Sequence, residues 1–142
     1  MKKLTLIFLL TAAFFAGNAQ GLSQHEPASE KLVLDNGAKW KVDKITSDNV
    51  ANLQQTVKAT NGKSVKSLKG YHMAGVALQN GITKMIRECR MKGPDHLALH
   101  KWLEPLMEKV SKLSRASDVT VAAQLLDAIK ARLNLYNQYF QV

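Results

Sequence analysis

The sequence predicts an all-α protein, an antiparallel four-helix bundle preceded by a short N-terminal β-hairpin or extended strap. From residue 46 onward, apolar residues recur at spacings of three and four, which is the period of an amphipathic helix. Glycine, proline and N-cap residues divide this part of the chain into four such segments with short connections. Because helices joined by short connections pack antiparallel, residues 46–142 are expected to form one bundle.

The first helix is the most polar of the four. Three favourable N-cap residues, Thr46, Ser47 and Asp48, stand at its expected start. Asn61-Gly62 is expected to end it, because glycine and asparagine accept the left-handed conformation that follows many helices. The core residues expected from this helix are Val50, Leu53 and Val57.

The second helix is expected to begin between Ser64 and Ser67 and to run to about Cys89. Its glycines each cost about 1 kcal/mol relative to alanine, but they allow a neighbouring helix to approach closely. These glycines are Gly70, Gly75 and Gly81. The face expected to be apolar carries Tyr71, Ala74, Leu78, Ile82, Met85 and Cys89.

Two prolines mark the third helix. Pro94 suits the first helical position, and Asp95 beside it is favourable at the positive end of the helix dipole. Pro105 lies inside the helix, where it cannot donate a hydrogen bond to the carbonyl of Lys101. A kink is therefore expected over residues 101–105.

The fourth helix is expected to begin near Ser117 or Asp118 and to run almost to the C-terminus. Its apolar stripe follows the same spacing as that of the third helix. Together the two stripes are expected to supply half of the core, with Leu99, Leu103, Leu106, Val110, Leu113, Leu125, Leu126, Ile129, Leu133, Tyr136 and Phe140.

Residues 1–19 have the features of a secretory signal peptide. Lys2 and Lys3 form a basic start, residues 4–16 are almost entirely apolar, and small residues lead up to Ala19. Cleavage after Ala19 is expected, so the protein would be exported to the periplasm or secreted. The apolar run is too short to span a bilayer comfortably, so a retained anchor is less favoured and no membrane partner is expected after cleavage.

Residues 20–45 are expected to form a flexible N-terminus followed by the hairpin or strap. Asp35-Asn36-Gly37 is a strong turn signal between two short β-prone runs, residues 32–34 and 40–42. Because an isolated hairpin is only marginally stable, Trp40 is expected to pack on the bundle.

The chain is basic, with a formal net charge of +9. Loss of the two lysines in the signal peptide would leave about +7. A basic exported protein could bind an acidic protein partner or surface, but a solvated basic surface is the more favoured interpretation of scattered lysines. The lysines are scattered and no aromatic residues are interleaved with them, so no nucleic-acid partner is expected.

Potential metal ligands are concentrated in one short segment, which contains Cys89, Met91, His96 and His100. Thiolate, thioether and imidazole groups are favoured by copper, and the same set occurs in blue-copper centres. His96 and His100 are four residues apart, so they share one helix face with Cβ atoms about 5–6 Å apart. If the second helix ends beside Cys89 and the third begins at Pro94, the four side chains converge. The sequence therefore predicts a copper ion as cofactor, used in metal handling or electron transfer.

Other interpretations of this segment stay open. Zinc is less favoured: it would use Cys89, His96 and His100 with water in an open position, and thioether is a poor zinc ligand. Alternatively, the protein is a non-catalytic structural or interaction module with Cys89 buried in the core. Catalysis by a cysteine–histidine pair is least favoured, because the sequence shows no recognisable orienting residue or oxyanion hole.

Further candidates are expected to lie outside the metal site. Met85 and Met107 fit core packing better than metal binding, and Trp102 is expected to shield the pocket or to pack on a neighbour. His72 lies on the same helix as Cys89 but about 25 Å away at 1.5 Å per residue. It is expected to be partly exposed.

Two segments resemble a group of small exported proteins of Bacteroidetes-type bacteria. These proteins carry an LNNGxKWK-like segment and a CxMxGxxHxxLHxWL-like segment. The corresponding segments are LDNGAKWKV (34–42) and CRMKGPDHLALHKWL (89–103). The resemblance implies that the segment around Cys89 belongs to a recurring pattern, and it implies no particular activity.

Overall fold

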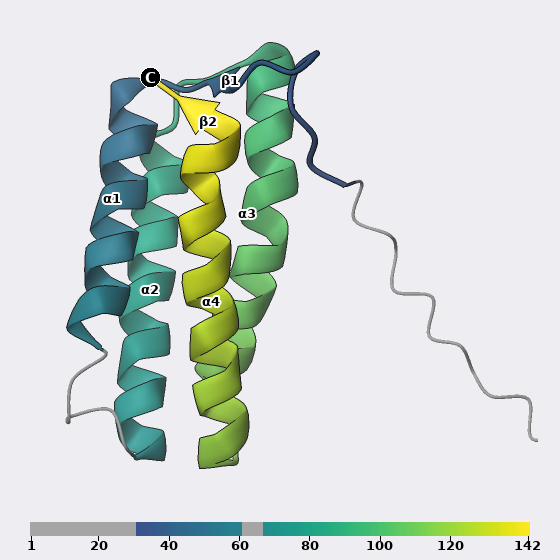
Figure 1. The fold of residues 1–142 in the computed structure, drawn as a ribbon. Coiled ribbons are helices and arrows are strands. Elements are labelled where there is room, and N and C mark those ends of the chain that lie inside the picture. Colours follow the sequence, from purple (N-terminus) through teal and green to yellow (C-terminus); the bar gives the residue numbers. More distant parts are fainter. Residues whose placement is uncertain (1–30, 61–66) are drawn as a thin grey trace, which may run out of the picture.

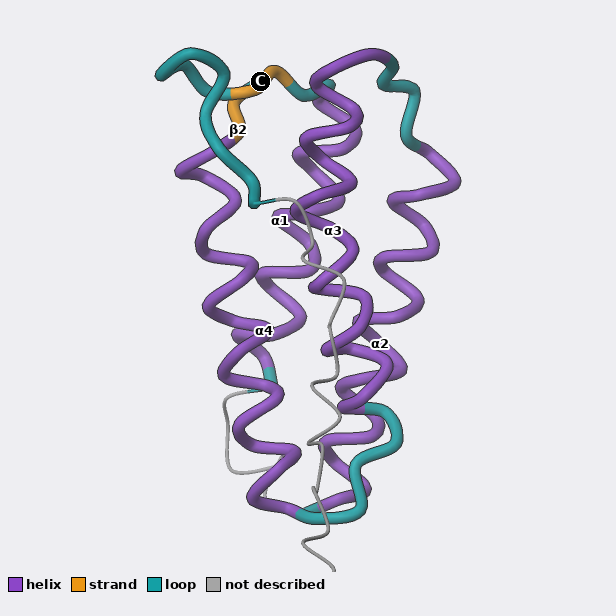
Figure 2. The backbone as a smooth tube through the Cα atoms, turned by 90° about the vertical axis from the view of Figure 1, so that its right-hand side faces the viewer, coloured by secondary structure: helices purple, strands orange, loops and turns teal. Residues whose placement is uncertain are grey.

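The structure is a computed structural model, and it describes residues 31–60 and 67–142. These residues form four helices, packed side by side in antiparallel order in both views (Figures 1 and 2). They are α1 (Lys44–Ala59), α2 (Leu68–Glu88), α3 (Gly93–Leu113) and α4 (Val119–Tyr139). The predicted four-helix bundle is confirmed. The expected signal peptide and flexible start, and the expected helix end at Asn61-Gly62, lie outside the described residues.

Helix α1 begins earlier than predicted, because Asp43 is its N-cap. The Asp43 carboxylate accepts a hydrogen bond from the backbone N–H of Thr46 at 2.7 Å. Thr46 is itself fully buried in the first turn, so the expected caps at Thr46, Ser47 and Asp48 are wrong. All four are residue types that favour this position, and the local sequence does not choose among them.

The other helix starts follow the sequence closely. Ser67 caps α2 by accepting from the N–H of Gly70 at 3.2 Å, and Asp118 caps α4 by accepting from that of Val121 at 2.9 Å. Both residues lie in the predicted ranges. None of the helices in the described part of the chain is both long and apolar enough to cross a bilayer.

The corner between α2 and α3 turns within a few residues. Helix α2 ends at Glu88, and Cys89 is its C-cap in an extended conformation. Helix α3 begins at Gly93, whose φ of +70° is favourable for glycine, and Pro94 follows in the first turn. The prediction that one helix stops beside Cys89 and the next begins at Pro94 is confirmed to within one residue.

The core lies along the bundle axis and is formed by the predicted apolar stripes. Trp102, fully buried on α3, packs edge-on against Tyr136 and Phe140 with ring centroids 5.1 and 6.3 Å apart. Tyr136 and Phe140 also stack on each other at 5.0 Å. This aromatic cluster fills the end of the bundle where the chain terminates.

The N-terminal segment is a strap and not a hairpin of the two β-prone runs. Asp35 and Ala38 exchange backbone hydrogen bonds at 2.8 and 2.9 Å around the predicted turn. Strand β1 (Trp40–Lys41) instead pairs in parallel with β2 (Phe140–Gln141) at the opposite end of the sequence. Figure 1 shows the two strands together over the end of the bundle. The strap thus closes the end that also carries the corner between α2 and α3.

Candidate functional site

The corner between α2 and α3 is held from two sides. The buried side-chain amide of Asn49 on α1 donates to Oε2 of Glu88, the last residue of α2, at 2.9 Å. The backbone N–H of Lys41 in the strap donates to Oδ1 of Asp95, in the first turn of α3, at 2.8 Å. Side chains on either side of the corner are therefore positioned by the tertiary structure as well as by their own helices.

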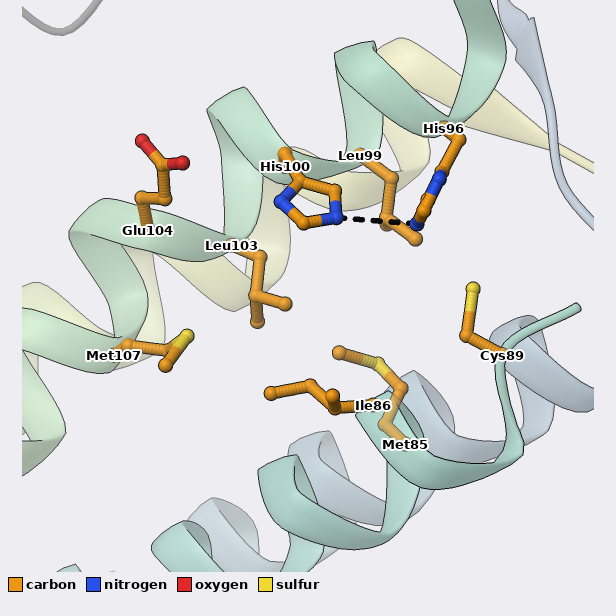
Figure 3. A pocket seen from close by; sticks show the side chains of 9 residues that line it. All are labelled: Met85, Ile86, Cys89, His96, Leu99, His100, Leu103, Glu104 and Met107. Atoms are coloured by element: carbon orange, nitrogen blue, oxygen red, sulfur yellow. Dashed lines mark hydrogen bonds between the residues drawn. The ribbon is translucent and has the colours of Figure 1, made fainter. Parts of the chain in front are cut away.

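A pocket of about 270 Å³ opens between α2 and α3 beside this corner (Figure 3). Its wall is largely apolar, with two imidazoles, one thiol and one carboxylate among the lining residues. The lining residues are Met85, Ile86, Cys89, His96, Leu99, His100, Leu103, Glu104 and Met107. Concave, mostly apolar pockets with a few polar groups are typical of ligand sites.

His96 and His100 are in direct contact on the α3 wall of the pocket. Their Nε2 atoms are 3.1 Å apart in a hydrogen bond, and their rings meet edge to face with centroids 4.6 Å apart. One ring must therefore carry its proton on Nε2 while the other presents a lone pair there. Two nitrogens bound to one tetrahedral ion at 2.0–2.1 Å would be about 3.3 Å apart, close to the separation seen.

Cys89 lies across the pocket from the histidine pair. Its side chain is half-buried, and Figure 3 shows the thiol pointing from the end of α2 toward the wall that carries His96. The structure thus brings Cys89, His96 and His100 to one pocket. Met91 is not among the lining residues and packs, half-buried, against the core instead. It sits in the turn between α2 and α3.

Two methionines that were expected to pack in the core also line the pocket. Met85 is one helical turn before Cys89 and is almost fully buried, while Met107 is half-buried on α3. Met107 packs against the core as expected and also lines the pocket, so its place outside the metal site stays a prediction. The spacing carried a usable signal, because Met107 continues the helix face of His96, His100 and Glu104.

The side chains are not arranged as a finished metal centre. Across residues 31–60 and 67–142, no group of three or more His, Cys, Asp or Glu side chains is placed to hold a metal ion as it stands. Coordination by Cys89 and both histidines would require the rings to give up their mutual hydrogen bond.

Two other candidates from the sequence have structural roles elsewhere. His72 is half-buried near the far end of α2, where its Nε2 lies 2.7 Å from the carbonyl oxygen of Ala116. Trp102 packs in the core, and its indole N–H donates to the carbonyl of Arg132 at 3.0 Å. Neither residue lines the pocket beside Cys89.

Comparison with known proteins returns no matching family model, curated protein or solved structure. Function therefore has to be inferred from the chemistry of the pocket itself.

Proposed function

We propose that the protein is an exported helical bundle that binds a transition metal through Cys89, His96 and His100, with copper as the favoured metal. One observation carries the proposal: the three side chains line one pocket, and the two Nε2 atoms are already 3.1 Å apart. The physiological role would be metal handling or electron transfer. Export after cleavage at Ala19 and an acidic partner or surface belong to the same proposal.

Metal binding in this pocket breaks one hydrogen bond and releases one proton. Coordination replaces the hydrogen bond between His96 and His100 by two metal–nitrogen bonds, so both rings bind in the neutral form. The thiol of Cys89 loses its proton to solvent as the sulfur–metal bond forms. Zinc can use the same three residues with water as a fourth ligand, which makes it the competing ion to compare with copper.

A titration tests the proposal. The chain from residue 20 onward, which keeps every described residue, is titrated with Cu(I) under anaerobic conditions against a competing chelator, and separately with Cu(II) and Zn(II). One ion per chain is expected. Cys89→Ser and His96→Ala are expected to weaken binding by at least about tenfold, because each removes a direct ligand.

His72→Ala is the matched control, since His72 lies outside the pocket and should leave metal affinity unchanged. Met91→Leu is a second control of the same kind. Binding no tighter than micromolar for every ion, or equal affinity in the wild type and both ligand variants, would reject the proposal.

The alternative is a non-catalytic interaction module. It is favoured by the apolar character of the pocket wall and by Ile86, which is 49 % exposed at the pocket. In that case the pocket would receive an apolar side chain of a partner. Failure of all three ions to bind would leave this function as the better account of the pocket.

A further inference from the structure

We infer that the pocket selects a soft monovalent ion, Cu(I), with Ag(I) as its redox-inert analogue, over Cu(II) and Zn(II). This inference rests on the proposed function. It is carried by the thioether of Met85, which the pocket adds to the cysteine and histidines, and by the apolar surroundings in which the ion's charge must be accommodated.

Two thioethers line the pocket, and one of them lies beside the proposed ligands. Met85 reaches the pocket from α2 one turn below Cys89, so its sulfur can approach an ion held between Cys89 and the histidines (Figure 3). Met107 lies toward the other end of the pocket, about 10 Å along α3 from His100, so it is too far to bind the same ion. Thioether sulfur is a soft, uncharged ligand that favours Cu(I) and contributes little to zinc binding. Unbranched methionine side chains also adapt to an ion without displacing their helices.

The charge balance of the site also favours a monovalent ion. The thiolate of Cys89 with a monovalent cation makes a neutral unit, and imidazole and thioether ligands add no charge. A divalent ion would leave one uncompensated positive charge next to the apolar wall, which is costly. The basic side chains at the corner, Arg87, Arg90 and Lys92, are exposed and would add to that cost.

Glu104 is the one carboxylate among the lining residues, and it is exposed at the pocket's edge. Screening by water limits what it can contribute to an ion held near Cys89. A divalent ion would nevertheless depend on this carboxylate more than a monovalent ion does. Glu104→Gln therefore separates the two charge states in an experiment.

The selectivity bears on the physiological role. Electron transfer requires that Cu(I) and Cu(II) both stay bound, whereas storage or transfer of the ion requires only Cu(I). A pocket that stabilises the reduced ion with a thioether and an apolar wall favours metal handling over electron transfer.

The test compares four ions on five proteins. Cu(I), Ag(I), Cu(II) and Zn(II) are titrated with competing chelators into the wild type, Met85→Leu, Met107→Leu, Glu104→Gln and Met91→Leu, starting from residue 20. Leucine nearly conserves the volume of methionine, and circular dichroism and urea unfolding check that each variant is folded. Met91→Leu and Met107→Leu are the matched controls, because the first loses a thioether outside the pocket and the second loses one about 10 Å along α3 from His100.

Met85→Leu is expected to lower the affinity for Cu(I) and Ag(I) by about tenfold and to leave that for Zn(II) within about twofold, whereas Met91→Leu and Met107→Leu should match the wild type. Glu104→Gln is expected to weaken only the divalent ions. If zinc binds and Met85→Leu does not differ from the two control variants, the selectivity is overturned while the metal site stands. If no ion binds to the wild type, the proposed function and this inference both fail.

Discussion

The guanidinium of Arg132 on α4 lies where Pro105 interrupts the hydrogen bonding of α3. Pro105 has no N–H to donate to the carbonyl of Lys101, and Nη2 of Arg132 donates to that oxygen at 2.7 Å. Nε of the same side chain donates to the carbonyl of Trp102 at 3.0 Å, and the Trp102 indole donates back to the carbonyl of Arg132. Arg132 on α4 thus supplies the hydrogen bond to the carbonyl of Lys101 that Pro105 on α3 cannot donate.

Replacing Arg132 by alanine is expected to lower the free energy of unfolding by about 2 kcal/mol, because two hydrogen bonds from a charged donor to half-buried carbonyls are lost. Urea unfolding followed by circular dichroism measures the loss. Arg132→Lys should recover only part of the stability, since an ammonium cannot reproduce the forked geometry of the guanidinium.

A double-mutant cycle with Pro105→Ala tests the cause of this loss. Alanine restores an N–H that can donate to the carbonyl of Lys101, so removal of Arg132 should cost measurably less in that background. An equal cost in both backgrounds would show that Arg132 stabilises the bundle independently of the proline.

The cap at Asp43 should make the bundle sensitive to acid. Partial burial opposes ionisation of Asp43, but its polar interactions with Thr46 and with the backbone of Arg90 outweigh this effect and lower the pKa. A carboxyl group with a lowered folded-state pKa contributes stability above its unfolded pKa and loses it as the pH falls through the folded value.

Asp43→Ala is accordingly expected to cost about 1 kcal/mol at pH 7, a usual value for loss of an N-cap. The difference from the wild type should shrink below about pH 4, as the carboxyl group becomes protonated. Urea midpoints measured from pH 7 down to pH 2.5 check this. Asp48→Ala is the control, because Asp48 is not a cap and its ion pair with Lys44 is exposed.

The helices could be predicted because their signals are local. Ser67, Gly93, Pro94 and Asp118 each specify a helix end through their own backbone or side-chain chemistry, and the structure uses all four. The pairing of Trp40 with Phe140 could not be predicted, because it joins residues from opposite ends of the chain. No local pattern chooses such a partner over a hairpin.

For the candidate site too, the residues on helices could be predicted from local signals and the residue in the turn could not. Helix periodicity placed His96 and His100 together, and the chain turn placed Cys89 near them. The pocket lining does not include Met91, because a residue in a turn has no fixed periodicity. It does include Met107, which continues the helix face of the two histidines, and both methionines pack against the core.

Two glycines on α2 should respond differently to alanine. A Cβ at Gly75 would lie 2.9 Å from the backbone nitrogen of Ser114, whereas one at Gly81 would meet the end of the Leu53 side chain at 2.6 Å. Backbone cannot yield as a side chain can, so Gly75→Ala is expected to destabilise the protein by about 1–3 kcal/mol. In Gly81→Ala the gain in helix propensity, about 1 kcal/mol, should offset much of the strain. Thermal unfolding of both variants measures the contrast, and equal losses would contradict it.

The histidine pair should be dispensable for folding although it lines the pocket. His100 is exposed, and its hydrogen bond and ring contact with His96 lie near solvent, so His100→Ala should change the free energy of unfolding of the metal-free protein by less than about 1 kcal/mol. Leu99→Ala, next to it but buried, should cost about 2–5 kcal/mol.

Copper should stabilise the wild type more than His100→Ala. At a free concentration 100 times its dissociation constant, copper should raise the free energy of unfolding of the wild type by about 2.7 kcal/mol, because a ligand that binds the folded state shifts the unfolding equilibrium. His100→Ala should gain much less at the same concentration. Urea unfolding with and without Cu(I) gives both quantities, and a large loss in the metal-free His100→Ala protein would mean that the pair stabilises the fold instead.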